Sequence, residues 1–210
     1  MKPTIEVISA LPNQTKPTYL LVVLHGWGAN YQDFVPFAKE LNLPDFGYMF
    51  PNAPFDHFQV PGGKAWYALE DKSFTGLESS RKLLLDWLNS LEANTGVPLS
   101  RTILAGFSQG GAMTLDVGLT LPLAAICSFS GYLHYEPQMQ ENATYPRTMI
   151  VHGRQDSVVP LAAAIQAQKE LTKIGVSLEY QEFDMAHEIK DEAIAFFKRF
   201  ILEQVISKIA

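Results

Sequence analysis

The sequence predicts an α/β fold in which a mostly parallel central sheet carries helices on both faces. Runs of apolar and β-branched residues alternate along the chain with longer segments in which apolar residues recur at helical spacing, a pattern typical of parallel sheets connected by helices. Most of the short runs are almost continuously apolar. Such runs indicate strands buried on both faces, because strands with one solvent-facing side alternate apolar and polar residues.

Strands and helices are expected to follow one another along the chain. We expect strands at 19–26, 47–54, 102–108, 124–131, 148–153 and 177–183. We expect helices at 31–42, 76–94, 109–121, 160–174 and 190–208.

Two of these helices carry further signals. Before the second helix, Thr75 and Glu78 have the spacing of a capping box, and Gly96 indicates where that helix ends. In the last helix, basic residues do not line the polar face, so it is expected to face the core rather than a membrane surface. Its buried face is expected to consist of Ala193, Phe197, Phe200 and Val205.

Length and composition favour a single domain spanning residues 1–210. The chain has 210 residues, of which 47% are hydrophobic, so it can bury a sizeable core without disulfide bonds. Its one cysteine, Cys127, lies in the apolar run AAICSF and is expected to be a buried, unreactive thiol. The sequence shows neither a signal peptide nor an apolar run of membrane-spanning length, which favours a cytoplasmic protein without stable membrane insertion.

The charge balance argues against binding of nucleic acid. The 16 basic and 22 acidic residues give a net charge of −6, and basic residues form no cluster longer than a pair. Nucleic acid is therefore not an expected partner, and the sequence leaves the oligomeric state open.

The stretch TILAGFSQGGAM at 102–113 points to chemistry at Ser108. Gly106 and Gly110 flank this serine in the pattern G-x-S-x-G, with an expected strand before it and an expected helix after it. On such a tight turn a serine hydroxyl projects from the carboxyl edge of the sheet, above the start of a helix. The sequence therefore predicts a nucleophile, and the alternative is a serine that only caps the following helix.

A serine nucleophile needs a base, and His187 is the predicted one. In folds with this kind of turn, the catalytic acid follows the serine in the sequence, and the histidine follows the acid. His134 and His152 also follow Ser108, but each would need an acid between Ser108 and itself. His187 lies in EFDMAHEI, between the last expected strand and the last expected helix, although a structural loop histidine is the alternative. No HExxH motif accompanies it, so no zinc site is expected.

The acid that orients the base is predicted to be Asp156. In MIVHGRQDSVVP a strand ends and a turn follows, which places Asp156 at the same sheet edge as Ser108. Asp184 is the rival, but it lies only three residues before His187 and would reach the far side of the imidazole with difficulty. An ordinary turn aspartate is the other reading of Asp156.

An oxyanion hole is expected beside Ser108. The stretch VVLHGWGANY leaves the first long strand through a glycine-rich turn, and glycines let the backbone approach the nucleophile. We assign the hole to the backbone N–H groups of Trp27 and Gln109. His25 precedes Ser108 and is given no part in proton transfer.

Two long loops, 53–67 and 132–147, are rich in aromatic residues and are expected to surround the serine. Their apolar residues could form an acyl pocket or could be core beneath the loops. The chain leaves little room for a large cap domain, so an open site for small to medium acyl groups is expected. The candidate substrate-binding residues are Phe55, Phe58, Trp66, Tyr132, Leu133 and Met185.

Several stretches together resemble the phospholipase/carboxylesterase family of α/β-hydrolases. They are LHGWGAN, FPNAP, AWYAL, GFSQGGAM, SFSGYL, VHGRQDSVVP and AHEI. The resemblance implies an α/β-hydrolase fold, ester hydrolysis without a cofactor, and the same triad and oxyanion donors. The family often has Asp where Ala29 and Asn30 stand, Gly at Ala186 and an acidic residue at Ala68, and these departures leave the preferred leaving group open.

The sequence therefore predicts a serine carboxylesterase that forms an acyl-enzyme on small ester substrates, without metal or cofactor. Thioesters or lysophospholipids could be hydrolysed at the same site, as an acyl-protein thioesterase or a lysophospholipase would do. Dienelactone-hydrolase-like enzymes share the size and architecture but use cysteine on the turn where this chain has Ser108. A noncatalytic binding protein of the same fold is the remaining alternative.

Overall fold

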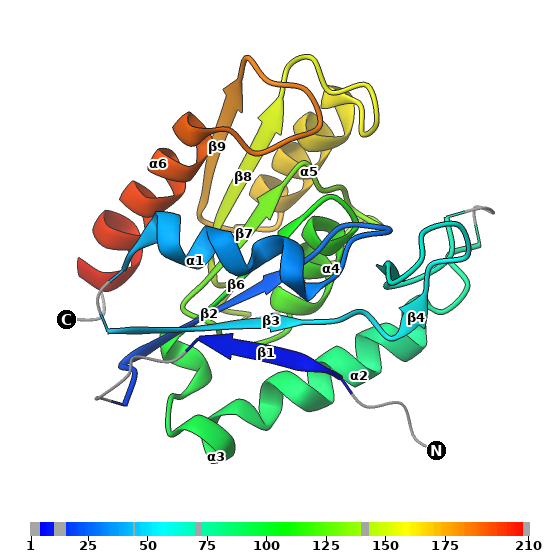
Figure 1. The fold of residues 1–210 in the computed structure, drawn as a ribbon. Coiled ribbons are helices and arrows are strands. Elements are labelled where there is room, and N and C mark those ends of the chain that lie inside the picture. The colour runs from blue at the N-terminus through cyan, green and yellow to red at the C-terminus, as the bar shows by residue number, and fades with distance from the viewer. Residues whose placement is uncertain (1–4, 11–15, 44, 70–72, 140–142, 208–210) are drawn as a thin grey trace.

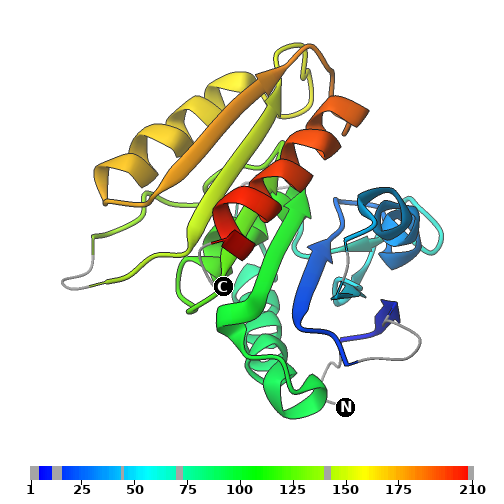
Figure 2. The same ribbon diagram turned by 90° about the vertical axis from the view of Figure 1, so that its left-hand side faces the viewer.

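A computed structural model describes residues 5–10, 16–43, 45–69, 73–139 and 143–207. Its main sheet has seven strands in the order β1-β3-β2-β6-β7-β8-β9, all parallel except the antiparallel edge strand β1 (Figure 1). The sheet twists from β1 at one end to β9 at the other (Figure 2). The strands are β1 (Val7–Ala10), β2 (Tyr19–Leu24), β3 (Phe46–Pro51), β6 (Thr102–Phe107), β7 (Ala125–Phe129), β8 (Arg147–Gly153) and β9 (Leu178–Phe183).

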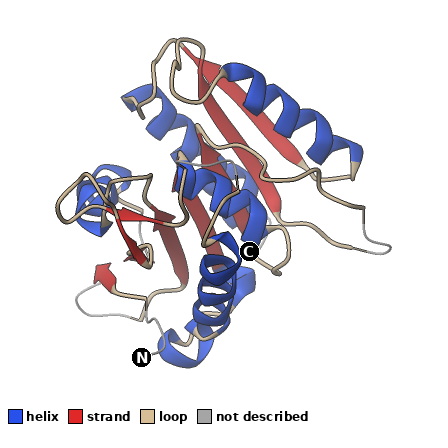
Figure 3. Ribbon diagram, turned by 90° about the vertical axis from the view of Figure 1, so that its right-hand side faces the viewer, coloured by secondary structure: helices blue, strands red, loops and turns tan. Residues whose placement is uncertain are grey.

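Helices cover both faces of this sheet, as expected (Figure 3). One face packs against α2 (Leu77–Asn89), α3 (Leu91–Thr95), α4 (Gln109–Gly118) and α5 (Leu161–Lys173). The other face packs against α1 (Val35–Leu41), α6 (Asp191–Phe200) and the π-helical turn η3 (Ile201–Ile206). Short 3-10 turns lie at η1 (Tyr31–Phe34) and η2 (Leu99–Arg101).

The expected strands are confirmed, and two short features escaped prediction. The edge strand β1 is only four residues long and half exposed, so it lacks the apolar run that marks the central strands. Inside the expected loop 53–67, β4 (Phe55–Asp56) pairs with β5 (Lys64–Ala65) as a small hairpin. Strands of two residues carry too little periodicity to be recognised in a sequence.

The expected capping box at the start of α2 is wrong. Gly76 is the N-cap, with a φ of 96° that suits glycine, and no side chain caps this helix. Instead, Thr75 bonds to Ser73 and Glu78 pairs with Arg81. The end of this segment at Gly96 is confirmed, because Gly96 adopts a φ of 79° and donates its N–H to the carbonyl of Glu92.

The remaining expectations about packing are confirmed where the structure describes the residues. Cys127 is fully buried, and burial raises the pKa of its thiol well above the ordinary value. The last helix continues into η3, and the end of its expected span, at residue 208, lies outside the described residues. Among the described residues, no helix combines the length and apolar character needed to cross a bilayer. The expected buried face of the last helix is present: Ala193, Phe197, Phe200 and Val205.

Candidate active site

Ser108 lies on a strained turn between β6 and α4. Its φ of 54° and ψ of −117° are unusual for a residue with a side chain, and such strain is typical of functional sites. A Cβ at Gly106 would lie 2.2 Å from the carbonyl oxygen of Gly110, and one at Gly110 would lie 2.3 Å from that of Leu24. Both glycines are therefore required by close backbone contacts. The Ser108 side chain makes no capping bond to α4, so it does not serve as a helix cap.

The loops after β8 and β9 complete a hydrogen-bonded chain with this serine. His187 Nε2 lies 2.9 Å from Ser108 Oγ, and His187 Nδ1 lies 2.7 Å from Asp156 Oδ2. The second carboxylate oxygen of Asp156 accepts the backbone N–H groups of Val158 and Val159, each at 2.9 Å. The sequence-predicted Ser108, His187 and Asp156 are thus brought together by three separate loops.

The charge state of Asp156 fixes the orientation of the imidazole. Burial of this side chain favours the neutral acid, but hydrogen bonds from His187, Val159 and Val158 outweigh it, so the pKa of Asp156 is lowered. A carboxylate at this position accepts the Nδ1–H of His187. The Nε2 lone pair of His187 is then directed at the Ser108 hydroxyl.

The residues considered as alternatives for the acid and the base have other hydrogen-bond partners. Asp184 is exposed and forms an ion pair with Arg154 at 2.7 Å. His152 donates its Nε2–H to the carbonyl of Val159 at 2.8 Å, and this nitrogen lies 3.5 Å from the Asp156 carboxylate. His134, in the loop that follows β7, bonds to Asp116 and Tyr67. None of the three contacts Ser108.

Trp27 and Gln109, the expected oxyanion donors, both adjoin the turn that carries Ser108. A Cβ at Gly26 would lie 3.4 Å from the Ser108 Cβ, so the turn that carries Trp27 packs directly against the serine. Gln109 is the first residue of α4, where N–H groups are free and the helix dipole is positive. Among the described residues, neither N–H group donates a hydrogen bond.

The side chain of Gln109 has a part that sequence reasoning missed. It is buried, its Oε1 accepts the N–H of Trp66 at 2.9 Å, and its Nε2 donates to the carbonyl of Tyr67 at 2.8 Å. Both bonds fasten the segment after β5 to the turn that carries Ser108. The glutamine within G-x-S-x-G was the available signal, since a polar side chain at the start of a buried helix needs partners.

His25 stabilises the turn that carries Trp27 through two hydrogen bonds. Its Nδ1–H donates to the carbonyl of Gly26 at 2.8 Å, and its Nε2 accepts the N–H of Ala53 at 3.0 Å. Burial lowers its pKa to about 4, so the ring is neutral at pH 7 and both nitrogens are occupied. This arrangement agrees with the expectation that His25 takes no part in proton transfer.

Two cavities meet at Ser108, His187 and Trp27. We call the first, of about 600 Å³, the apolar cavity; its other walls are Leu69, Phe74, Tyr132, Val158, Val159, Pro160 and Ala163. We call the second, of about 450 Å³, the acidic-rimmed cavity, since it combines Phe34, Phe37, Phe107 and Ile194 with the carboxylates Asp33, Glu40 and Glu188.

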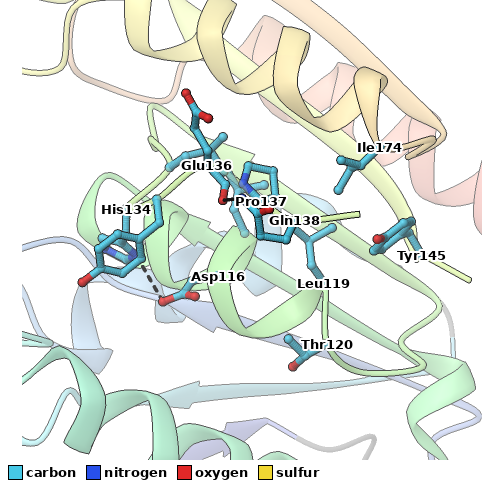
Figure 4. A pocket seen from close by; sticks show the side chains of 12 residues that line it. Asp116, Leu119, Thr120, His134, Glu136, Pro137, Gln138, Tyr145 and Ile174 are labelled. Atoms are coloured by element: carbon cyan, nitrogen blue, oxygen red, sulfur yellow. Dashed lines mark hydrogen bonds and ion pairs between the residues drawn. The ribbon is translucent and has the colours of Figure 1, made fainter. Parts of the chain in front are cut away.

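The structure places the candidate substrate-binding residues in different surroundings. Tyr132 lines the apolar cavity. Phe55 and Phe58 line a neighbouring cavity of about 360 Å³ that also contacts Trp27. Three candidates were wrong: Trp66 and Met185 are fully buried in the core, and Leu133 lines a separate cavity beside Asp116 and His134, shown in Figure 4.

The sequence reasoning overlooked most walls of the apolar cavity. Val158 and Val159 directly follow Asp156 in DSVVP, and Ala163 lies in the first turn of α5. Their position at the carboxyl edge of the sheet was an available signal. In the part of the chain that is described, no group of three or more His, Cys, Asp or Glu residues is arranged to hold a metal ion.

Comparisons with known proteins extend over nearly the whole chain. A family model described as Phospholipase/Carboxylesterase matches residues 5–205. Acyl-protein thioesterase 1 of Saccharomyces cerevisiae is 29% identical over 218 residues, which cover 89% of this chain and 93% of that protein. Esterase YpfH of Escherichia coli is 28% identical over 191 residues, with 84% and 79% covered.

Solved structures share the same fold. The crystal structure of esterase PE8 superposes with a TM-score of 0.89 at 29% identity and covers 97% of this chain and 100% of that chain. Arabidopsis thaliana SOBER1, at 22% identity, superposes with a TM-score of 0.77 over 89% of this chain and 98% of that chain. The second likeness concerns the fold alone.

Proposed function

Because the chain belongs to the phospholipase/carboxylesterase family of α/β-hydrolases, we propose that it is a serine carboxylesterase with Ser108, His187 and Asp156 as its catalytic residues. The observation that carries this proposal is the continuous hydrogen-bonded chain from Ser108 Oγ through His187 to the Asp156 carboxylate. A serine hydroxyl becomes nucleophilic when a positioned base accepts its proton.

The proposed reaction has two half-reactions. In the first, His187 Nε2 takes the Ser108 proton as Oγ attacks the ester carbonyl, and the N–H groups of Trp27 and Gln109 stabilise the oxyanion. The tetrahedral intermediate collapses, the bond to the leaving oxygen breaks, and His187 gives its proton to the alcohol. In the second, a water molecule attacks the acyl-serine in the same way and releases the carboxylic acid and free Ser108.

The two cavities suggest where the parts of the substrate bind. The apolar cavity has walls of aliphatic and aromatic side chains, which suits an acyl chain. The acidic-rimmed cavity carries carboxylates at its edge, which suits a polar leaving group. Both cavities are open to solvent, so we propose small to medium acyl groups as substrates.

Thioesters fit the same site as a second substrate class. The yeast relative is an acyl-protein thioesterase, and thioester hydrolysis uses the same attack, oxyanion and proton transfers with a thiol as the leaving group. A hydrolysis series with matched oxygen and sulfur esters separates the two classes.

Hydrolysis of a p-nitrophenyl ester by the wild type and by Ser108→Ala tests the proposal. The variant is expected to lose turnover while it stays folded, as circular dichroism can verify. A folded Ser108→Ala protein that still hydrolyses the ester at the wild-type rate would overturn the assignment.

A further inference from the structure

A second aspartate–histidine pair lies close to the active site. His134 Nδ1 is 3.1 Å from Asp116 Oδ2, a contact drawn in Figure 4, and His134 Nε2 is 2.7 Å from the hydroxyl of Tyr67. The Tyr67 hydroxyl in turn lies 2.6 Å from that of Tyr132. Four side chains from α4, from the loop after β7 and from the segment after β5 thus form one continuous chain of hydrogen bonds.

The first member of this chain is held as a carboxylate. Arg81 on α2 contacts both carboxylate oxygens of Asp116, at 2.9 and 2.7 Å. Burial of Asp116 favours the neutral acid, but hydrogen bonds from His134 and Arg81 outweigh it and lower the pKa of Asp116. Asp116 can therefore only accept a hydrogen bond from His134.

This constraint fixes the direction of the hydrogen bond between Asp116 and His134. The His134 side chain is 1% exposed, and its Nδ1–H donates to the Asp116 carboxylate. On the other side of the ring, hydrogen bonds join Nε2 to the Tyr67 hydroxyl and that hydroxyl to the hydroxyl of Tyr132.

This chain does not form a second hydrolytic centre. Tyr67 stands where the serine of a triad would stand, but it is fully buried, and burial raises the pKa of its hydroxyl far above the ordinary value. A substrate carbonyl cannot reach it. The chain therefore serves to hold side chains in place.

Two of the side chains held in this way are walls of the apolar cavity. Tyr132 and Phe74 both line that cavity together with Ser108. The ring centroid of His134 lies 5.3 Å from that of Phe74 and 5.7 Å from that of Tyr132, both nearly perpendicular. His134 thus contacts both walls from behind, although it does not line the cavity itself.

We propose that His134 is a positioning residue that determines which acyl groups the apolar cavity accepts. It acts through the Tyr67 hydroxyl on Tyr132 and through ring packing on Phe74. The inference rests on the proposed esterase function and adds a specificity determinant to it. Acyl chains long enough to contact these two walls are expected to depend on His134, whereas an acetyl group is expected to be independent of it.

The test compares kcat and KM for p-nitrophenyl acetate and p-nitrophenyl octanoate in the wild type and in His134→Phe. Phenylalanine keeps an aromatic ring against Phe74 but removes both hydrogen bonds. We expect KM for the octanoate to rise about fivefold, the effect of losing the hydrogen bond to Tyr67 that positions Tyr132, and kcat for the acetate to change by less than about twofold. Equal losses on both esters, or no loss on either, would overturn the proposal.

Tyr132→Phe and Leu91→Ala serve as a second variant and a control. Tyr132→Phe removes only the last hydroxyl of the chain, and should raise KM for the octanoate in the same direction even if His134→Phe does not fold. Leu91 is buried in α3, which is not part of the cavity. Leu91→Ala should lower stability with an unchanged ratio between the two esters, and a shifted ratio would count against the proposal.

A readout without substrate separates this inference from the proposed function. Long-range ¹H–¹⁵N NMR of the histidine rings should report His134 with the proton on Nδ1 in the wild type. A proton on Nε2 alone would contradict the hydrogen-bond direction and overturn the inference, whatever the enzyme hydrolyses. Absence of ester hydrolysis in the wild type would instead overturn the proposed function.

Discussion

The Nε2 atom of His187 lies 2.9 Å from the Oγ atom of Ser108, although 79 positions separate the two residues in the sequence. The sheet brings them together because the parallel strands β6 and β9 end at the same edge. Asp156, from the loop that follows the intervening strand β8, approaches the imidazole from its other side.

Asp156→Asn is expected to lower kcat by about 10³–10⁴-fold, because an amide can donate to His187 and favours the wrong tautomer. Asp184→Asn is the matched control, since Asp184 is exposed and pairs with Arg154 on the surface. Steady-state kinetics with one p-nitrophenyl ester measure both. Similar losses in the two variants would contradict the choice of Asp156 as the acid.

Gln109→Ala is expected to lower kcat by about 10–100-fold while the backbone N–H at this position remains. Its side chain fastens Trp66 and Tyr67 to the turn beside the nucleophile, and small displacements near reacting atoms have effects of this size. Gln166→Ala is the control, because Gln166 bonds to Glu170 on α5, which does not carry the triad. If kcat of Gln109→Ala equals that of the control, these two bonds do not position the site.

His25 is expected to make stability depend on pH. Its pKa is about 4 in the folded protein and 6.5 ordinarily, so the unfolded chain binds a proton more readily. The free energy of unfolding should therefore fall as the pH decreases from 6.5 towards 4, by about 3 kcal/mol from this residue.

Urea unfolding of the wild type and of His25→Asn, followed at several pH values, isolates this effect. The variant is expected to lose less stability than the wild type between pH 6.5 and 4. Parallel curves for the two proteins would show that His25 is not the group responsible.

Ala163→Phe is expected to shorten the acyl groups that the protein hydrolyses. Ala163 lines the apolar cavity, and a phenyl ring there would occupy the space proposed for the acyl chain. Ala162→Phe is the control, because Ala162 is exposed on the same helix and does not line the cavity.

A hydrolysis series from acetyl to palmitoyl esters measures this effect. Ala163→Phe should lose octanoyl turnover by about tenfold or more and keep acetyl turnover, whereas Ala162→Phe should match the wild type. The wild type itself should prefer small to medium chains, and a preference confined to palmitoyl esters would contradict an open site.

Local signals in the sequence were sufficient to predict the turn at Ser108 and the strands around it. The run TILAGF, the serine and the glycines are contiguous, and each glycine meets a close backbone contact. Chain order and position at strand ends were sufficient to select His187 and Asp156 for the hydrogen-bonded chain.

Burial of single loop residues could not be predicted in the same way. Trp66 and Met185 are apolar residues in loops, and only the packing of distant segments decides whether such side chains line a cavity or fill the core. The strand β1 forms by pairing with β3, some 40 positions away. With four residues, β1 is too short to show a periodic pattern of its own. The partners of Gln109 and His134 likewise come from distant parts of the chain.

Labelling with a fluorophosphonate probe, followed by peptide mass spectrometry, tests the central claim most directly. The account predicts one covalent adduct on Ser108 in the wild type and none in Ser108→Ala, because only the hydroxyl paired with His187 is reactive. A wild-type protein that stays unmodified, or that carries the adduct on another residue, would contradict it.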